Sequence, residues 1–397
     1  MRRYLALARL PRGPRLLVGS LLVAPGQAAI DLVILLALHH ATGSFGPGGV
    51  AVAAATIGFS ITTIVQGHVI DRVGIGRVLL PAAVVLVVAT AALAVALAVG
   101  AEPAVLVVLT AALGLGTPAT GPAVRTAWTA AATDADTRAT AFSYCSATQD
   151  VGFVAGPALF GLLATATTPV ISLACCGGLV ASGAIAIGSG AAAPASVERL
   201  MPGRARDLMR SLAPLAAVMA AVGVTLGAVD VSAPAFASQH GHPGLAGVLV
   251  AASALGSVLG GLLYGARSWR LSATRRLLIF TVAVAVLLVL PAIASTPAEA
   301  AAGLLIAGAP LGATLTTAYL LAGDIVPEER TTVGFSLISL TLNGGAAAGY
   351  AVAAQIAAHG SASSGFLLAA AAAIVGALVT AGLTRRTLVV TAVHHRR

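Results

Sequence analysis

Three aspartates are the residues of this sequence best suited to chemistry, because each lies within a long apolar run. They are Asp31, Asp150 and Asp230. An ionised carboxylate at the middle of a bilayer costs at least roughly 2.5–3.5 kcal/mol, so acids in such runs are candidates for function. Carrying protons is the chemistry that suits them, and we expect Asp150 and Asp31 to be the proton-coupling residues. The alternative for each is a structural carboxylate that neighbouring polar groups satisfy.

Asp150 belongs to a stripe of polar residues. Ser143, Ser146 and Asp150 share one helix face by their spacing, and Ser336, Ser339 and Asn343 repeat that pattern in the second half of the chain. Lipid would reject both stripes, so we expect them to line a central cavity that binds the substrate. The residues predicted to line this cavity are Gln27, Ser143, Ser146, Asp230, Thr316, Tyr319, Ser339 and Asn343.

Long apolar segments must position these residues. The chain is 58% hydrophobic and 9% charged, whereas soluble domains carry about 25% charged residues. Apolar runs of about 20 residues, each long enough to cross a bilayer, recur throughout. We therefore predict an all-α membrane protein with twelve transmembrane helices. They fall near 16–38, 48–69, 78–100, 103–123, 140–163, 168–191, 212–236, 245–266, 277–296, 299–322, 333–356 and 364–384.

The arginines predict the orientation of these helices. All 22 basic residues are arginines, and in the twelve-helix scheme every one lies in a terminus, the central linker or an even-numbered turn. The positive-inside rule then places both termini in the cytoplasm. We expect no basic residue within a span, which disfavours an anionic substrate. The net charge of +9 suits anionic lipid at the cytoplasmic surface, and nucleic acid is excluded because no aqueous domain is present to bind it.

Two internal repeats divide the chain into halves. The segment GVAVAAATIG (49–58) matches GVLVAASALG (247–256) at six of ten positions, and FSYCSATQDVGFVAG (142–156) matches FSLISLTLNGGAAAG (335–349) at seven of fifteen. Each match pairs a helix with one six spans later, so the halves have the same orientation. We predict two parallel six-helix bundles, 1–192 and 212–397, joined by a cytoplasmic linker at 193–211, an architecture of secondary transporters.

The turn GHVIDRVGIGR (67–77) concentrates charge in a chain that has little. Its Gly67, Asp71, Arg72, Gly74 and Arg77 resemble the G-x-x-x-D-R-x-G-R-R loop between helices 2 and 3 of the major facilitator superfamily. The resemblance covers essentially the whole chain and implies the fold of that family and transport by alternating access.

The resemblance also implies a role for this turn as a conformational gate. In the family the aspartate docks at the cytoplasmic end of helix 11, which would begin here near 331–335, and helps to latch the outward-open state. The repeat makes Gly265 and Arg270 the counterparts of Gly67 and Arg72, but it pairs Asp71 with Trp269. We therefore expect an asymmetric gate. The alternative is a solvated turn with incidental charge.

A second segment, GFVAGPALFG (152–161), resembles the helix-5 motif of drug:proton antiporters. The matching residues, which we expect to pack helices closely, are Gly152, Gly156, Pro157 and Gly161. Those antiporters also tend to carry an arginine within helix 4. The segment 113–122 has none, and we expect Arg125 to lie beyond the span.

These features predict a secondary transporter, most simply a monomer, in the cell membrane of a high-GC bacterium. The preferred activity is proton-coupled efflux of a small neutral or cationic, partly apolar molecule. Uptake of a neutral solute and a non-transporting receptor are alternatives. An enzyme is disfavoured because no nucleophile elbow or phosphate loop is present, and we expect neither a cofactor nor a metal because the histidines sit at span ends and in the tail.

Overall fold

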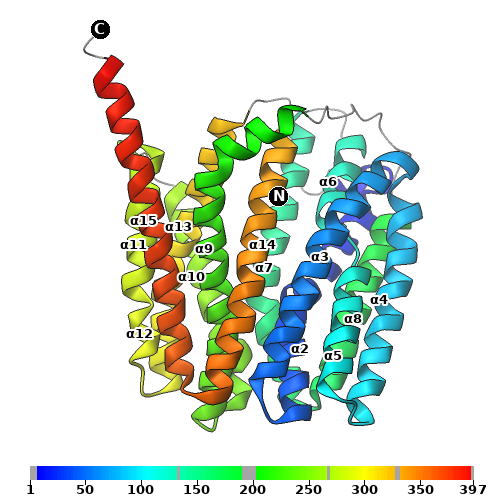
Figure 1. Ribbon diagram of the computed structural model, residues 1–397. Helices are drawn as coiled ribbons and strands as arrows, with labels where there is room; N and C mark the ends of the chain where they lie inside the picture. Colours follow the sequence, from blue (N-terminus) through cyan, green and yellow to red (C-terminus); the bar gives the residue numbers. More distant parts are fainter. Residues whose placement is uncertain (1–6, 132–134, 190–202, 266–268, 327–330, 395–397) are drawn as a thin grey trace. The chain divides into compact units, whose positions relative to one another are not determined.

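The computed structural model describes residues 7–131, 135–189, 203–265, 269–326 and 331–394. Within these ranges the chain is helical and contains no strand (Figure 1). Twelve helical spans in this part of the chain are long and apolar enough to cross a membrane, which confirms the predicted number. The chain divides into two compact units, residues 1–199 and 200–397.

Each unit contains helices for six spans. In the N-terminal unit they are α2 (Gly13–Thr42), α3 (Phe45–Val73), α4 (Ile75–Ala98), α5 (Pro103–Gly116), α6 (Thr120–Ala131), α7 (Ala135–Ala166) and α8 (Pro169–Ser189). In the C-terminal unit they are α9 (Gly203–Gln239), η1 (Pro243–Leu245), α10 (Ala246–Gly265), α11 (Ala273–Leu287), α12 (Val289–Ala292), α13 (Pro297–Ile325), α14 (Thr331–His359) and α15 (Ala362–His394). Helix α9 begins inside the range predicted as the linker.

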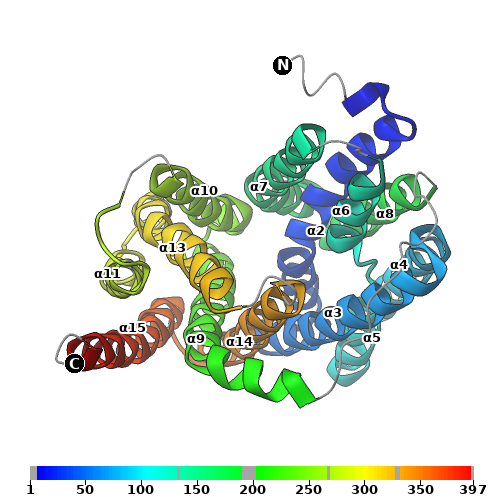
Figure 2. The same ribbon diagram turned by 90° about the horizontal axis from the view of Figure 1, so that it is seen from above.

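The two units pack their helices in the same pattern. In the N-terminal unit α2 packs against α7 and α8, α3 against α5, and α4 against α8 and α5. In the C-terminal unit α9 packs against α14 and α15, α10 against α13, and α11 against α15 and α13 (Figure 2). Each of these contacts in the N-terminal unit has a matching contact in the C-terminal unit, between the spans that come six later in the chain. For example, α2 and α7 are spans 1 and 5, and α9 and α14 are spans 7 and 11. The structural repeat therefore follows the sequence repeat.

Small residues bring helix backbones together within each unit. A Cβ atom added at Gly260 of α10 would overlap the backbone of Ala309 in α13, and one at Gly308 would overlap the carbonyl of Ser253. Close approach of this kind is typical of membrane helices, where packing rather than the hydrophobic effect drives association. Large apolar side chains instead cover the outside of the helices, for example Val88 at 62% exposed and Leu263 at 70%.

Span 4 differs from the prediction in two ways. It was predicted as one helix over 103–123, but it breaks at Thr117–Pro118–Ala119 into α5 and α6. The helical span also continues to Trp128 and so includes Arg125. The prediction that no arginine lies within a span was therefore wrong for Arg125, and likewise for Arg15, Arg77, Arg275 and Arg276, which lie in the first turns of other spans. Span 9 is likewise divided between α11 and α12. Hydropathy reports where apolar residues stop, whereas the helical backbone continues beyond them.

Candidate functional site

The turn between α3 and α4 depends on two of its glycines. Gly74 has a φ of 96°, a conformation that side chains rarely adopt, and its N–H donates to the carbonyl of Ile70 at 2.9 Å. A Cβ at Gly76 would lie 2.7 Å from the carbonyl oxygen of Gly188 in α8, whereas one at Gly67 would meet nothing within 4 Å. In this turn it is therefore Gly76, and not Gly67, that lies close to the backbone of another helix.

The charged residues of this predicted gate are only partly described. Arg72 and Arg77 are exposed at the end of α3 and the start of α4. The backbone of Asp71 lies in the last turn of α3, but its side chain lies outside the described residues. Helix α14 begins at Thr331, where the resemblance places the start of helix 11. The docking of Asp71 on that helix stays a prediction.

The counterpart turn in the C-terminal unit is built from aromatic residues. Gly265 ends α10, and Arg270 is exposed in the turn that follows. Trp269, at the position that the repeat pairs with Asp71, stacks on Tyr264 with ring centroids 5.2 Å apart and donates its indole N–H to the carbonyl of Tyr264 at 2.9 Å. This turn therefore differs from its counterpart in chemistry as well as in sequence.

Asp150 lies near the middle of α7. The side chains of Asp150 and Ser146 are both exposed on the surface of the N-terminal unit, whereas Cys145 and Thr148 on the opposite face are buried. In the described part of the chain Asp150 accepts no hydrogen bond. The side chain of Ser143 lies outside the described residues. The two described residues of the α7 stripe, Ser146 and Asp150, are thus exposed. That this stripe lines a substrate cavity stays a prediction.

The break in span 4 is bridged by a glutamine from α3. Gln66 donates its side-chain N–H to the carbonyl of Thr117 at 3.3 Å, and its side-chain oxygen accepts the N–H of Ala119 at 2.9 Å. These bonds satisfy backbone groups that the break would otherwise leave without partners. Gln66 was missed by the sequence analysis because nothing in its local sequence marks it.

Gln27 of α2 also contacts this break. Its side-chain oxygen accepts a hydrogen bond from Thr120 Oγ1, the first residue of α6, at 3.1 Å. Asp31 lies one turn further along α2 and is part-buried. The predicted pair of Gln27 and Asp31 therefore lies beside a polar interruption of the membrane span rather than on an uninterrupted helix.

Arg125 lies within α6, five residues after its start at Thr120. Its Nη2 donates to the side-chain oxygen of Gln149 in α7 at 3.0 Å. A Cβ at Gly121, one turn earlier, would lie 3.8 Å from Arg125 Nη1. Arg125 therefore lies on a helix rather than in the predicted turn.

Asp230 of α9 has a hydrogen-bond partner. Tyr350 of α14, which is 7% exposed, donates its hydroxyl to Asp230 Oδ2 at 3.0 Å. Tyr350 was not among the predicted residues, although it follows Asn343 by seven residues and so continues the same helix face. Asp230 therefore lies in a polar contact between two helices of the C-terminal unit.

The remaining predicted cavity residues of the C-terminal unit lie on α13 and α14. The hydroxyls of Tyr319 and Ser339 are hydrogen-bonded at 3.1 Å, which joins two residues predicted independently. Thr316 donates to the carbonyl of Gly312 within its own helix at 2.9 Å, and it is part-buried like Asn343.

The helix-5 motif packs α7 against α2. A Cβ at Gly152 would lie 2.7 Å from the backbone of Ala24, and one at Gly156 would overlap the carbonyl of Pro25. Pro157 and Gly161 are buried in the same helix. The structure thus places both glycines where a close helix contact requires them.

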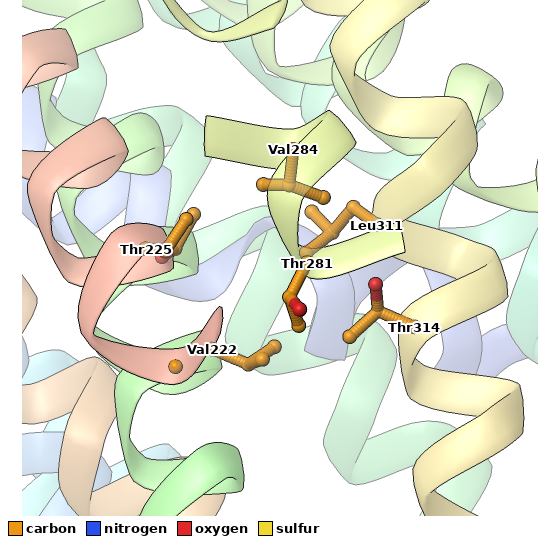
Figure 3. A pocket seen from close by; sticks show the side chains of 8 residues that line it. Val222, Thr225, Thr281, Val284, Leu311 and Thr314 are labelled. Carbon is orange, nitrogen blue, oxygen red and sulfur yellow. The ribbon is translucent and has the colours of Figure 1, made fainter. Parts of the chain in front are cut away.

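A small void lies inside the C-terminal unit (Figure 3). It is lined by Val222, Thr225, Thr281, Val284, Leu311, Thr314, Ala373 and Gly376. Its volume of about 10 Å³ is roughly what one water molecule needs. Each threonine hydroxyl donates to a carbonyl of its own helix. This void is too small for a substrate, and none of the predicted cavity residues lines it.

Comparisons with known proteins identify the fold. Residues 215–393 match the model of the Major Facilitator Superfamily. No curated protein matches the sequence. A mutant of the nucleoside transporter NupG superposes with a TM-score of 0.75 at 13% identity, covering 93% of this chain and 98% of that chain.

Two further solved structures share the architecture. The POT family transporter PepTSo has a TM-score of 0.72 at 14% identity, covering 94% of this chain and 97% of that one. A bacterial homologue of the iron transporter ferroportin in the inward-facing state has a TM-score of 0.70 at 16% identity, covering 93% and 97%. Identities this low establish the fold alone. The fold class predicted from the sequence is confirmed.

Proposed function

We propose that this protein, which has the major facilitator fold and whose residues 215–393 match the model of that superfamily, exports a small molecule in exchange for protons. The substrate is neutral or cationic and partly apolar, and it is moved by alternating access. The protein acts as a monomer in the cell membrane of a high-GC bacterium, with both termini in the cytoplasm.

The exposed carboxylate of Asp150 is the observation that carries this proposal. It is the seventh residue of the 23-residue membrane span Tyr144–Ala166, and it accepts no hydrogen bond from the described residues. A charge at that depth is costly in lipid, so acids there typically face water, a substrate pathway or a proton relay. We infer that Asp150 takes up and releases a proton during the transport cycle.

The internal repeat supports a role in proton transfer rather than in hydrogen bonding alone. Asp150 and Asn343 occupy matched positions in the two halves. An asparagine would supply hydrogen bonds at either position without the cost of removing a carboxylate from water. The half that retains an acid therefore has a group that can change charge, which its counterpart lacks.

The preference for a neutral or cationic substrate was predicted from the absence of basic residues within the spans, and the structure weakens that reason. Five arginines lie within the described spans, but each is at most three residues from a span end; they are Arg15, Arg77, Arg125, Arg275 and Arg276. The guanidinium of Arg125 also donates to the side-chain oxygen of Gln149. Asp31, Asp150 and Asp230 are all further inside, which favours cations and hydrogen-bonding neutral molecules over anions.

Inverted membrane vesicles with an imposed pH gradient test the proposal. An export protein accumulates substrate in inverted vesicles when their interior is acidic, whereas a proton-coupled importer carries it in the opposite direction. Asp150→Asn should abolish accumulation driven by the gradient but retain exchange of substrate without one. Glu102→Gln is a matched control, because it removes a carboxylate that is exposed at the end of a span.

Asp31→Asn ranks the two acids in the same assay. If Asp150→Asn transports with unaltered pH dependence and Asp31→Asn does not, the proton passes through Asp31. If both variants keep the dependence of the unmodified protein, both carboxylates are structural and the proposed coupling is wrong. Transport by neither the unmodified protein nor its variants, with any compound that binds, would favour a receptor.

A further inference from the structure

Arg276 lies against two of three mutually packed aromatic rings at the junction of α10 and α11. We call Tyr264, Trp269, Arg276 and Phe280 the arginine–aromatic cluster. The guanidinium of Arg276 donates to the hydroxyl of Tyr264, and its carbon lies 5.2 Å from the centroid of the Tyr264 ring and 5.9 Å from that of Trp269. Phe280 meets both rings edge-on, at 5.8 and 5.6 Å. These contacts hold the arginine and the indole in fixed positions.

Positive charge gathers around this cluster. Arg270 and Arg275 are exposed beside it. No carboxylate in the described part of the chain pairs with Arg270, Arg275 or Arg276. The first turn of α11 adds the positive end of a helix dipole, where the side chain of Ser272 accepts the N–H of Arg275. An anion would therefore be stabilised here by several charges at once.

The position of the cluster along the spans suggests what kind of anion this is. Tyr264 is the last residue of one membrane span, and the next begins at Ala273. Tryptophan and tyrosine are enriched at this level, where headgroups meet the hydrocarbon core. Large apolar side chains are exposed on the same two helices close by, including Leu263 at 70% and Ile279 at 51%. A ligand with a phosphate and an acyl chain can satisfy both surfaces.

We propose that the arginine–aromatic cluster, together with Arg270 and Arg275, binds the phosphate of an anionic phospholipid at the membrane surface that we expect to be cytoplasmic. Arginine suits this ligand because its planar guanidinium donates two parallel hydrogen bonds to phosphate oxygens. Arg276 positions Trp269, while the exposed Arg275 contacts the phosphate. Binding of this lipid does not depend on the proposed transport activity.

The matched turn of the N-terminal unit has half of these features. Arg72 and Arg77 correspond to Arg270 and Arg275, but Val78 stands in place of Arg276 and Asp71 in place of Trp269. That turn lacks the aromatic rings, and it has an acid beside its arginines. The structure therefore assigns the lipid site to the C-terminal unit alone.

Fluorescence quenching by brominated lipids tests the assignment. The full-length protein is reconstituted in bilayers that contain brominated phosphatidylglycerol or brominated phosphatidylcholine, and the quenching of Trp269 is compared. The chain has two tryptophans, and Trp128 is fully buried in the N-terminal unit. A Trp269→Phe variant therefore measures the background signal. We expect Trp269 to be quenched preferentially by phosphatidylglycerol.

Charge variants connect this preference to the cluster. Arg275→Gln should lower the preference for phosphatidylglycerol roughly fivefold, the effect of one arginine near an anionic surface, and Arg275→Lys should retain most of it. Arg9→Gln is the matched control, because it removes an exposed arginine from the N-terminal unit. Far-UV circular dichroism and size-exclusion chromatography show whether each variant is folded.

Three results would overturn the proposal. The first is an unchanged preference in folded Arg275→Gln. The second is an equal loss in Arg9→Gln, which would indicate attraction to the whole surface rather than a site. The third is displacement of the brominated phosphatidylglycerol by soluble glycerol phosphate at the same phosphate concentration, which would make the ligand a soluble phosphate rather than a lipid.

Discussion

Gly260 and Gly261 are neighbours in α10, yet only one of them lies at a helix contact. A Cβ at Gly260 would overlap the backbone of Ala309 in α13, whereas one at Gly261 would come no closer than 3.7 Å to Thr316 Oγ1. Because the obstructing atoms at Gly260 are backbone, no side-chain rotation can relieve the overlap. Gly260→Ala must therefore move α10 away from α13 and loosen the glycine contacts at Gly256, Gly308 and Gly312.

The neighbouring glycine allows the packing cost to be isolated. Overpacking of this kind costs about 1–3 kcal/mol. Alanine also gains about 1 kcal/mol over glycine in helix propensity, and this gain applies at both positions. We therefore expect the free energy of unfolding of Gly260→Ala to be about 1–3 kcal/mol below that of Gly261→Ala. Gly261→Ala itself should equal or slightly exceed the unmodified protein in stability.

Unfolding by sodium dodecyl sulfate in mixed micelles, followed by circular dichroism, measures this difference. The two variants share composition, charge and mean hydropathy, so detergent binding should affect them alike. Equal stability of Gly260→Ala and Gly261→Ala would refute the reasoning, because it would mean that α10 and α13 do not rely on backbone contact at Gly260.

Three further substitutions address the predicted gate and the polar contacts. Asp71→Asn should leave membrane insertion intact but slow turnover and favour the inward-open state; unchanged cysteine accessibility from each side of the membrane would leave a solvated turn instead. Gln66→Leu removes both side-chain hydrogen bonds at the break in span 4 and should lower the thermal midpoint of unfolding. The expected cost is about 1–3 kcal/mol for each buried backbone group left without a partner. An unaltered midpoint would show that the break does not depend on these hydrogen bonds. Tyr350→Phe removes the hydrogen bond to Asp230 and should cost about 0.6–1.7 kcal/mol in detergent unfolding; no loss would indicate that Asp230 finds another donor.

The number of spans follows from sequence because lipid offers the backbone no hydrogen-bonding partner, so an apolar run of the right length must be helical. The break in span 4 does not follow from sequence in this way. Proline and threonine are tolerated within membrane helices, and Pro25, Pro157 and Pro310 all lie inside unbroken helices. What distinguishes Pro118 is that Gln66 bonds the backbone on either side of it, at Thr117 and Ala119. Gln66 lies 51 positions before Thr117, so only the tertiary structure brings it near.

Among the polar residues, too, local sequence patterns predicted some contacts and missed others. Helical spacing predicted the stripe on α14, and Ser339 of that stripe is bonded to Tyr319, another predicted cavity residue. The same spacing contains Tyr350, but a tyrosine near an apolar run was not distinguished from a packing residue. Arg125 was misplaced because a charge ends an apolar run, while α6 continues as helix to Ala131.

The polar stripes on α7 and α14 have a consequence for how the protein enters the membrane. The spans that carry them, Tyr144–Ala166 and Leu337–His359, have the lowest mean hydropathy of the twelve in the described part of the chain. During synthesis these two segments would partition from the translocon into lipid less readily than their neighbours. Each has an earlier helix to receive it, since α7 packs on α2 through Gly152 and Gly156, and α14 packs on α9 through Gly345 and Gly349. The polar side chains of α7 and α14 make them the poorest insertion signals of the twelve described spans. As the chain emerges, the glycine contacts with α2 and α9 would hold these two helices in the membrane.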